Sequence, residues 1–133
     1  MTDATLTERL DAIEAGYEFS LAYAAQGRTD DAGTQMRNML ERMHAALDGL
    51  PPDIEAAVLR DGAKYAASTR RFLEAVRQDA AVAQGAIGLV LDRPAISSML
   101  VDNLNASIHL RALLTDLFLI DQARKKTTAD SVP

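Results

Sequence analysis

The chain has 133 residues, a formal net charge of −5 and no cysteine. This length fits one globular domain, and the lack of cysteine excludes disulfide frameworks, thiolate zinc sites and cysteine nucleophiles. The 24 alanines and 17 leucines far outnumber the 6 valines and 6 isoleucines, a balance that favours helices over sheets. We therefore expect a soluble, all-α protein.

Apolar residues recur every three or four positions along most of the chain, which is the pattern of amphipathic helices. The pattern predicts an up-and-down bundle of four main helices at about residues 6–26, 31–48, 53–83 and 94–125, with a possible short helical element at 84–91. We expect one domain over residues 1–126 and a disordered tail at 127–133.

Capping residues suggest where these helices begin and end. Thr5 and Glu8 have the spacing of a capping box at the start of the first helix. Gly49 and the prolines at 51–52 predict the end of the second helix. Gly62 is a possible break inside the third, and Pro94 is expected in the first turn of the last.

The last predicted helix carries more apolar surface than one face can hold. Four large apolar residues follow one another at 117–120, so they surround the helix. Either this helix is central and fully buried, or its second face meets another chain. We predict the second arrangement, with a homodimer or partner interface formed by Leu113, Leu117, Phe118, Leu119 and Ile120.

Two polar residues interrupt the apolar stripe of the same helix. Asn103 and Ser107 form a polar seam that would fix the register of a helix pair if it were buried. If the stripe drifts around the helix, both side chains reach water instead. The sequence leaves these alternatives open.

A metal-binding or small-molecule-binding bundle is the alternative function. Glu41 and His44 have the Glu-x-x-His spacing of di-iron bundles, but a second such motif is missing because Ala106 stands three residues before His109. A site would use His44 with Glu14, Glu18 or Glu41. We expect the side chains of these four residues to be solvated, and we expect no cofactor.

Other candidate sites are weaker. The sequence contains no glycine-rich phosphate loop, no Gly-x-Ser-x-Gly elbow and no His-Glu-x-x-His motif, so we expect no enzyme. Tyrosines and methionines could line a pocket, although core filling is favoured: Tyr17, Tyr23, Tyr65, Met36, Met39 and Met43. Arg70, Arg71 and Arg77 form a basic spot that we expect to be solvated.

The charge is unevenly distributed. Residues 1–53 hold 10 acids and 4 bases, whereas residues 54–133 hold 9 acids and 10 bases. This balance argues against binding of nucleic acid. No secretory signal and no apolar run of about 20 residues is seen, so we expect no membrane partner and a cytoplasmic location.

The function expected from these features is that of a non-enzymatic cytosolic interaction protein: an accessory, adaptor or assembly factor. It would act by helix–helix docking, as a homodimer, with the acidic N-terminal half steering the approach of its partner.

Overall fold

The computed structural model describes residues 3–62 and 66–130. Within these ranges it contains only helices, connected by turns and loops, and no strand. The helices are α1 (Asp3–Ala24), α2 (Met36–Leu47), α3 (Leu50–Asp61), α4 (Ala66–Leu91), α5 (Ser98–Ala106) and α6 (Ile108–Asp130). The predicted all-α class is confirmed.

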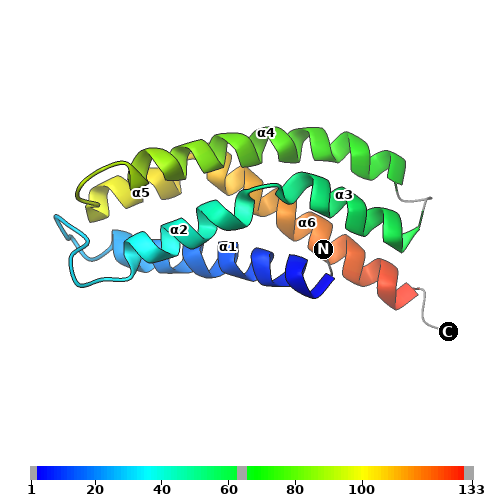
Figure 1. Cartoon of the computed structure of the whole chain (residues 1–133), viewed down its shortest axis with the longest axis horizontal. Helices are drawn as coiled ribbons and strands as arrows, with labels where there is room; N and C mark the ends of the chain where they lie inside the picture. Colours follow the sequence, from blue (N-terminus) through cyan, green and yellow to red (C-terminus); the bar gives the residue numbers. More distant parts are fainter. Residues whose placement is uncertain (1–2, 63–65, 131–133) are drawn as a thin grey trace.

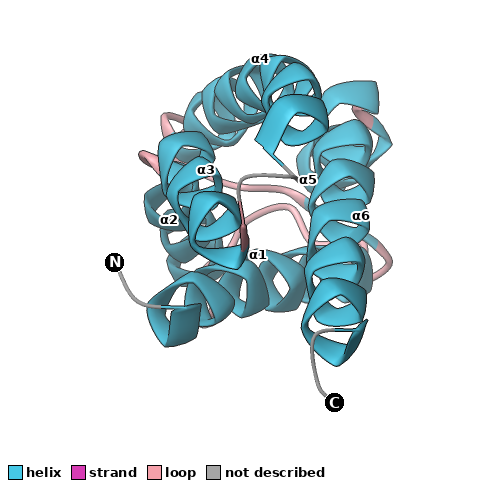
Figure 2. Cartoon of the chain, turned by 90° about the vertical axis from the view of Figure 1, so that its right-hand side faces the viewer, coloured by secondary structure: helices cyan, strands magenta, loops and turns pink. Residues whose placement is uncertain are grey.

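The helices run up and down along the long axis of the molecule (Figure 1). α1 forms the first pass, α2 and α3 together the second, α4 the third, and α5 with α6 the last. Seen along this axis, the passes surround a common centre (Figure 2). The described chain is thus a helical bundle of six helices rather than four, because the second and last passes are each broken.

The reversal predicted at residues 49–52 is at the wrong place. Gly49 adopts the left-handed conformation with φ 67° and ends α2, but the prolines at 51–52 then occupy the first turn of α3, where a missing N–H costs nothing. The chain therefore continues in the same direction, as Figure 1 shows. The predicted helix at 53–83 is instead two helices, and the break lies at Gly62, whose φ of 137° favours glycine.

The end of α4 matches the sequence more closely. The short element predicted at 84–91 is helical, and it forms the last turns of α4 rather than a separate helix. It includes Gly85, around which an added Cβ atom would meet no other atom within 4 Å.

The helix predicted at 94–125 differs from the observed helices α5 and α6 at both ends and in the middle. It begins at Ser98, because the Ser97 side chain accepts a hydrogen bond from the Leu100 N–H (3.0 Å), so Pro94 lies outside it. It breaks at Ser107, where ψ is 124° and the N–H bonds to the Leu104 carbonyl. α6 then continues to Asp130, which makes residues 127–130 of the predicted tail helical; 131–133 lie outside the described residues.

The starts of α1 and α2 were also predicted wrongly. Because α1 is already helical at Asp3, Thr5 and Glu8 lie inside it and do not cap its start. α2 begins at Met36 rather than near residue 31, because Asp31 belongs to a loop that is bonded to Ile96 in the loop between α4 and α5.

Apolar side chains from all six helices, together with Ile96 from the loop before α5, form one core. α1 and α2 approach closely at Gly16, where the Met43 side chain occupies the space that a Cβ atom would need. The largest almost fully buried side chains are Leu6, Ile13, Tyr23, Met36, Leu40, Met43, Leu50, Ile54, Leu73, Ile87, Ile96 and Leu110.

Buried hydrogen bonds join α1 to the start of α5. The Tyr23 hydroxyl donates to the Ile96 carbonyl, and the Ser98 hydroxyl donates to the Tyr23 carbonyl at 2.7 Å. The Arg28 N–H donates to the same Ser98 oxygen at 2.9 Å. These contacts hold the second half of α1 against α5.

The Asp31 carboxylate joins the loop before α2 to the loop before α5. One oxygen accepts the Ile96 N–H at 2.9 Å, and the other pairs with Arg37 at 3.2 Å. The bond from Ile96, supported by the nearby Arg37, lowers the pKa of Asp31 below its ordinary value of 3.8. Arg37 also donates to the carbonyls of Leu91 and Arg93 at the end of α4, each at 2.8 Å.

A second set of polar contacts secures the first half of α1. Arg9 donates to the carbonyls of Ala46 and Asp48 at the end of α2 and pairs with Asp53 of α3 at 2.5 Å. A cation at this position complements the negative end of the α2 dipole. α1 is therefore held at both ends.

Alanine substitutions at Gly16 and at Gly85 should change the free energy of unfolding in opposite directions. Gly16→Ala forces Met43 to move, so we expect a loss of about 1–3 kcal/mol in the free energy of unfolding. Gly85→Ala meets no atom and should raise it by about 0.5–1 kcal/mol. Urea unfolding followed by circular dichroism measures both; a Gly16→Ala protein as stable as the wild type would show that α1 and α2 are not packed this closely.

Asp31→Ala leaves the Ile96 N–H without its acceptor and Arg37 without its ion pair, so we expect a loss of about 1–3 kcal/mol at pH 7. Because the native pKa of Asp31 is lowered, this stabilisation is present above pH 3.8 and is lost as the pH falls below that value. The difference from wild type, measured by urea unfolding, should therefore shrink at pH 3. Asp30→Ala, at an exposed neighbour, is the control; an equal loss there contradicts the assignment.

Candidate interaction surface

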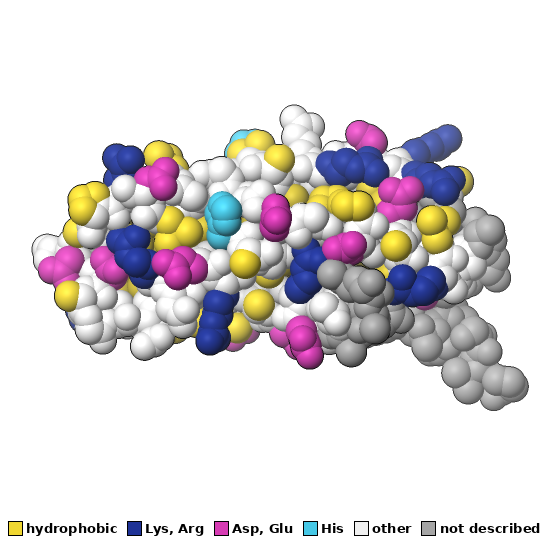
Figure 3. Space-filling view, in the orientation of Figure 1, with side chains coloured by type: hydrophobic (Ala, Val, Ile, Leu, Met, Phe, Trp, Pro, Cys, Tyr) yellow, Lys and Arg dark blue, Asp and Glu magenta, His cyan; other side chains and the backbone are white. Residues whose placement is uncertain are grey.

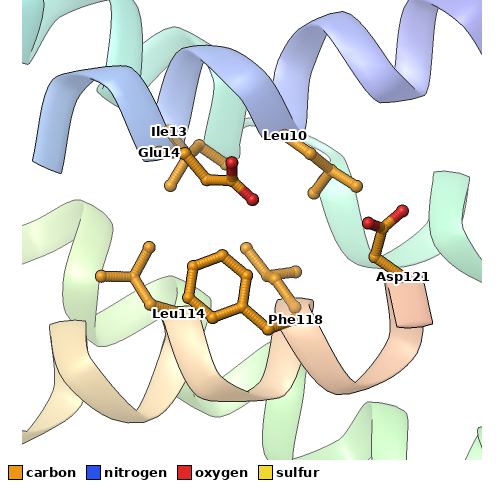
Figure 4. A pocket seen from close by; sticks show the side chains of 7 residues that line it. Leu10, Ile13, Glu14, Leu114, Phe118 and Asp121 are labelled. Carbon is orange, nitrogen blue, oxygen red and sulfur yellow. The ribbon is translucent and has the colours of Figure 1, made fainter. Parts of the chain in front are cut away.

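A narrow cleft lies between α1 and α6 (Figure 4). Its apolar lining comes from Leu10, Ile13, Leu114, Leu117 and Phe118, and two carboxylates, Glu14 and Asp121, complete it. The space inside is about 10 Å³, enough for one water molecule. The cleft is therefore too small for a substrate or cofactor, and it offers instead an apolar contact along its edge.

The cleft exists because α1 and α6 have different neighbours. α1 packs mainly against α2 and α5, whereas α6 packs mainly against α4. The break at Ser107 separates the part of the last pass that follows α1 from the part that follows α4. In Figure 4, side chains of α1 at residues 10–14 face side chains of α6 at residues 114–121.

The apolar residues predicted as an interface divide into two groups. Leu113 and Leu117 are buried in the core, so the prediction is wrong for them. Phe118 and Leu119 are 49% and 58% exposed, and Ile120 is half-buried against the core. Helix periodicity explains the division, because only two of four consecutive residues can face the same neighbour.

The predicted polar seam is not a buried seam. Asn103 is exposed, and Ser107 is half-buried at the break between α5 and α6. Asn105 of α5 is buried, and its side-chain amide atoms have no hydrogen-bond partner among the described residues. The break shifts the phase of the apolar stripe, and a straight-helix reading of the sequence misses this shift.

Carboxylates follow the cleft on the α1 side. Asp11, Glu14 and Glu18 are spaced three and four residues apart, so they form one ridge along the helix. Asp11 and Glu18 are exposed, and Glu14 is half-buried in the cleft. Asp121 lies on the α6 side. We call these four acids, together with Phe118, the α1–α6 edge.

The alternative metal site is not assembled. Glu14 lines the α1–α6 cleft, whereas Glu18 and Glu41 are exposed on α1 and α2. His44 lies in another depression. Within residues 3–62 and 66–130, no group of three or more histidines or acids is placed to hold a metal ion.

The depression at His44 is open and shallow, between α2 and α4. Its floor includes Gln84, Gly85 and Gly88, and Gln84 donates to the His44 carbonyl at 3.2 Å. The same side of the molecule is seen in Figure 3, where positive and negative side chains are interspersed. No cluster of ligating or catalytic groups faces this depression among the residues described.

The described tyrosines and methionines among these candidates fill the core. Met36, Met43 and Tyr23 are buried in the core, and Met39 and Tyr17 pack partly against it. Tyr65 lies outside the described residues.

The predicted basic spot carries ion pairs. Arg70 and Arg77 both bridge to Glu55 of α3, and Arg77 also pairs with Glu74. Arg71 is exposed.

Two carboxyl groups meet where α4 packs on α6. Asp116 lies within hydrogen-bonding reach of Asp79, and its Oδ2 is buried. Burial, followed by the hydrogen bond and the charge of Asp79, raises the pKa of Asp116 to about 7. Asp116 therefore keeps its proton under mildly acidic conditions. Sequence reasoning missed this pair because the two residues are far apart in the chain.

Comparison with known proteins adds no relative: no family model, curated protein or solved structure matches the chain. None of the helices, over the residues described, is sufficiently long and apolar to cross a membrane.

The aspartate pair makes stability fall as the pH rises. Native Asp116 holds its proton up to about pH 7, whereas an unfolded aspartate loses it near 3.8, so stability declines between these values and levels off above them. Asp116→Asn removes the charge, so we expect higher stability than wild type at pH 8 and little difference at pH 4. Urea midpoints at both pH values test this, with exposed Asp102→Asn as control; equal pH profiles in all three proteins would contradict it.

Proposed function

We propose that the protein is a non-enzymatic interaction protein that docks a helix on its α1–α6 edge. One observation carries the proposal: Phe118 and Leu119 are about half exposed, and Phe118 borders an apolar cleft. Burying a large apolar side chain contributes about 1.5–3 kcal/mol, so covering the exposed half of Phe118 contributes part of that amount.

Helix docking is the mode that suits this shape. The cleft lies between two long helices and runs along them, and a third helix with an apolar stripe can cover such a groove. The roles expected from the sequence, those of an accessory, adaptor or assembly factor in the cytoplasm, agree with a docking function and stay predictions. So does the homodimer, in which a second copy covers α6.

A tryptophan reporter tests docking directly, because the chain contains no tryptophan. In Phe118→Trp, we expect the emission to shift to the blue when the edge becomes covered, either as the protein concentration rises or when an amphipathic helical peptide is added. Three peptides share one leucine stripe and carry lysine, glutamate or glutamine at the polar positions.

Leu89→Trp is the matched control, because Leu89 is an exposed apolar residue on α4. The emission of the Leu89→Trp variant should stay constant when the protein concentration rises and when any of the three peptides is added. A Phe118→Trp emission that responds neither to concentration nor to any of the three peptides would refute the docking function.

A further inference from the structure

We propose that the helix docking on this protein is α6 of a second copy, which lies antiparallel to α6 of the first and crosses it at Thr115. In this pair, Arg111 of each copy stacks on Phe118 of the other. The inference rests on the proposed docking function and adds the identity of the partner and the way in which the two helices meet.

One face of α6 is exposed along most of the helix. Its residues are three or four positions apart, so they lie on one side. Ile108, Phe118 and Leu119 are 74%, 49% and 58% exposed, which places three large apolar side chains on this face. We call the following set the α6 outer face, in which only Ala112 is half-buried: Ile108, Arg111, Ala112, Thr115, Phe118, Leu119 and Gln122.

The charge of the α6 outer face selects the direction of the second helix. Arg111 is the only charged residue of the set. Asp116 faces α4 instead, and Asp121 lines the cleft. In a parallel two-fold pair each residue meets its own copy, so the two Arg111 side chains would repel each other. In an antiparallel pair centred at Thr115 they are about 12 Å apart along the helix axis.

One side of the antiparallel pair is an apolar contact. A two-fold axis at Thr115 places each residue level with the one equally far on the other side of Thr115 in the partner. Leu119 therefore lies between the partner's Ile108 and the partner's Ala112. A large side chain thus fits beside a small one, and the contact forms twice, once on each side of the axis.

The other side of the pair joins a cation to an aromatic ring. Phe118 lies three residues after Thr115 and Arg111 lies four residues before it, so the antiparallel arrangement brings them to nearly the same level. A guanidinium over the face of an aromatic ring is electrostatically favourable. Both side chains are exposed in the single copy, so neither has to leave the core to meet the other.

Thr115 allows close approach where the helices cross. Its hydroxyl donates to the Arg111 carbonyl, one turn earlier in the same helix, at 3.0 Å. The hydroxyl is therefore already bonded within its own copy, and covering it leaves no polar group without a partner.

A second copy suits this face better than an unrelated helix does. A two-fold interface requires a patch that is complementary to itself. The α6 outer face contains both members of each contact, Leu119 with Ala112 and Phe118 with Arg111. Covering the same face with a helix of another protein requires that helix to supply its own partner for Arg111.

The oligomeric state of matched variants tests the interface, measured by sedimentation equilibrium up to about 1 mM protein. The wild type should change from monomer to dimer as the concentration rises. Leu119→Glu places a charge in the apolar contact, so we expect at least about tenfold weaker association. Leu89→Glu, at a similarly exposed leucine of α4, should associate as the wild type does. Both substitutions are at the surface and should leave the helical circular dichroism intact.

Cysteine cross-linking tests the direction of the helices, because the chain contains no cysteine. Thr115→Cys lies on the axis, so a short bismaleimide should cross-link it to its own copy. Ile108→Cys alone should not react in this way, since its two copies are about 21 Å apart along the helix axis. A mixture of Ile108→Cys and Gln122→Cys proteins should cross-link. Leu89→Cys measures the background from random collision.

Arg111→Ala tests the stacking contact. We expect about two- to fivefold weaker dimerisation, because the ring of the partner's Phe118 loses its cation. Arg71→Ala, at an exposed arginine of α4, removes the same charge elsewhere and should have no effect. Equal weakening in both variants contradicts the stacking contact.

Several other outcomes would overturn the inference. If the wild type stays monomeric while Phe118→Trp responds to a peptide, the docking function stands and a second copy is not the partner. A dimer that Leu119→Glu leaves intact uses another surface, and Ile108→Cys that cross-links to its own copy shows a parallel pair. A Phe118→Trp emission that responds neither to concentration nor to any peptide refutes the docking function as well.

Discussion

The position of α1 relative to the rest of the bundle is the constraint on which the cleft depends. At one end of α1, Tyr23 is bonded to the loop before α5 and to Ser98; at the other, Arg9 is bonded to the α2–α3 connection. Because α1 is held at both ends, it cannot stay packed against the last pass where α6 diverges from α5 at Ser107. The divergence leaves Phe118 partly uncovered by the described residues.

Buried polar groups show where this fold is fully stabilised and where it is not. The Ile96 N–H and the Asp31 carboxylate satisfy each other, and Arg37 satisfies carbonyls at the end of α4. By contrast, Asn105 has no hydrogen-bond partner among the described residues, and Asp116 faces another acid. Both lie on the last pass, the one whose α6 borders the cleft. A buried polar group without a partner costs stability, so this pass is the less optimised part of the bundle.

Local patterns predicted much of the secondary structure and little of its connections. Helical spacing indicated every pass of the chain, and Gly62 was recognised as a possible break because glycine disfavours helix interiors. The prolines at 51–52 were misread as a reversal, since the same residues suit the first turn of a new helix. The break at Ser107 could not be predicted, because serine is compatible with either a helix interior or its end.

The excess of apolar residues at 117–120 was evident in the sequence, and Phe118 and Leu119 of that run are partly exposed in the structure. Which of the four residues are exposed was decided only by tertiary packing, as were the pairing of Asp79 with Asp116 and the position of the acidic ridge beside Phe118. The physical reason is that helix formation depends on hydrogen bonds between near neighbours, which periodicity reports directly. The direction that each helix face takes depends on contacts between residues far apart in the chain, and a single sequence contains no measure of these.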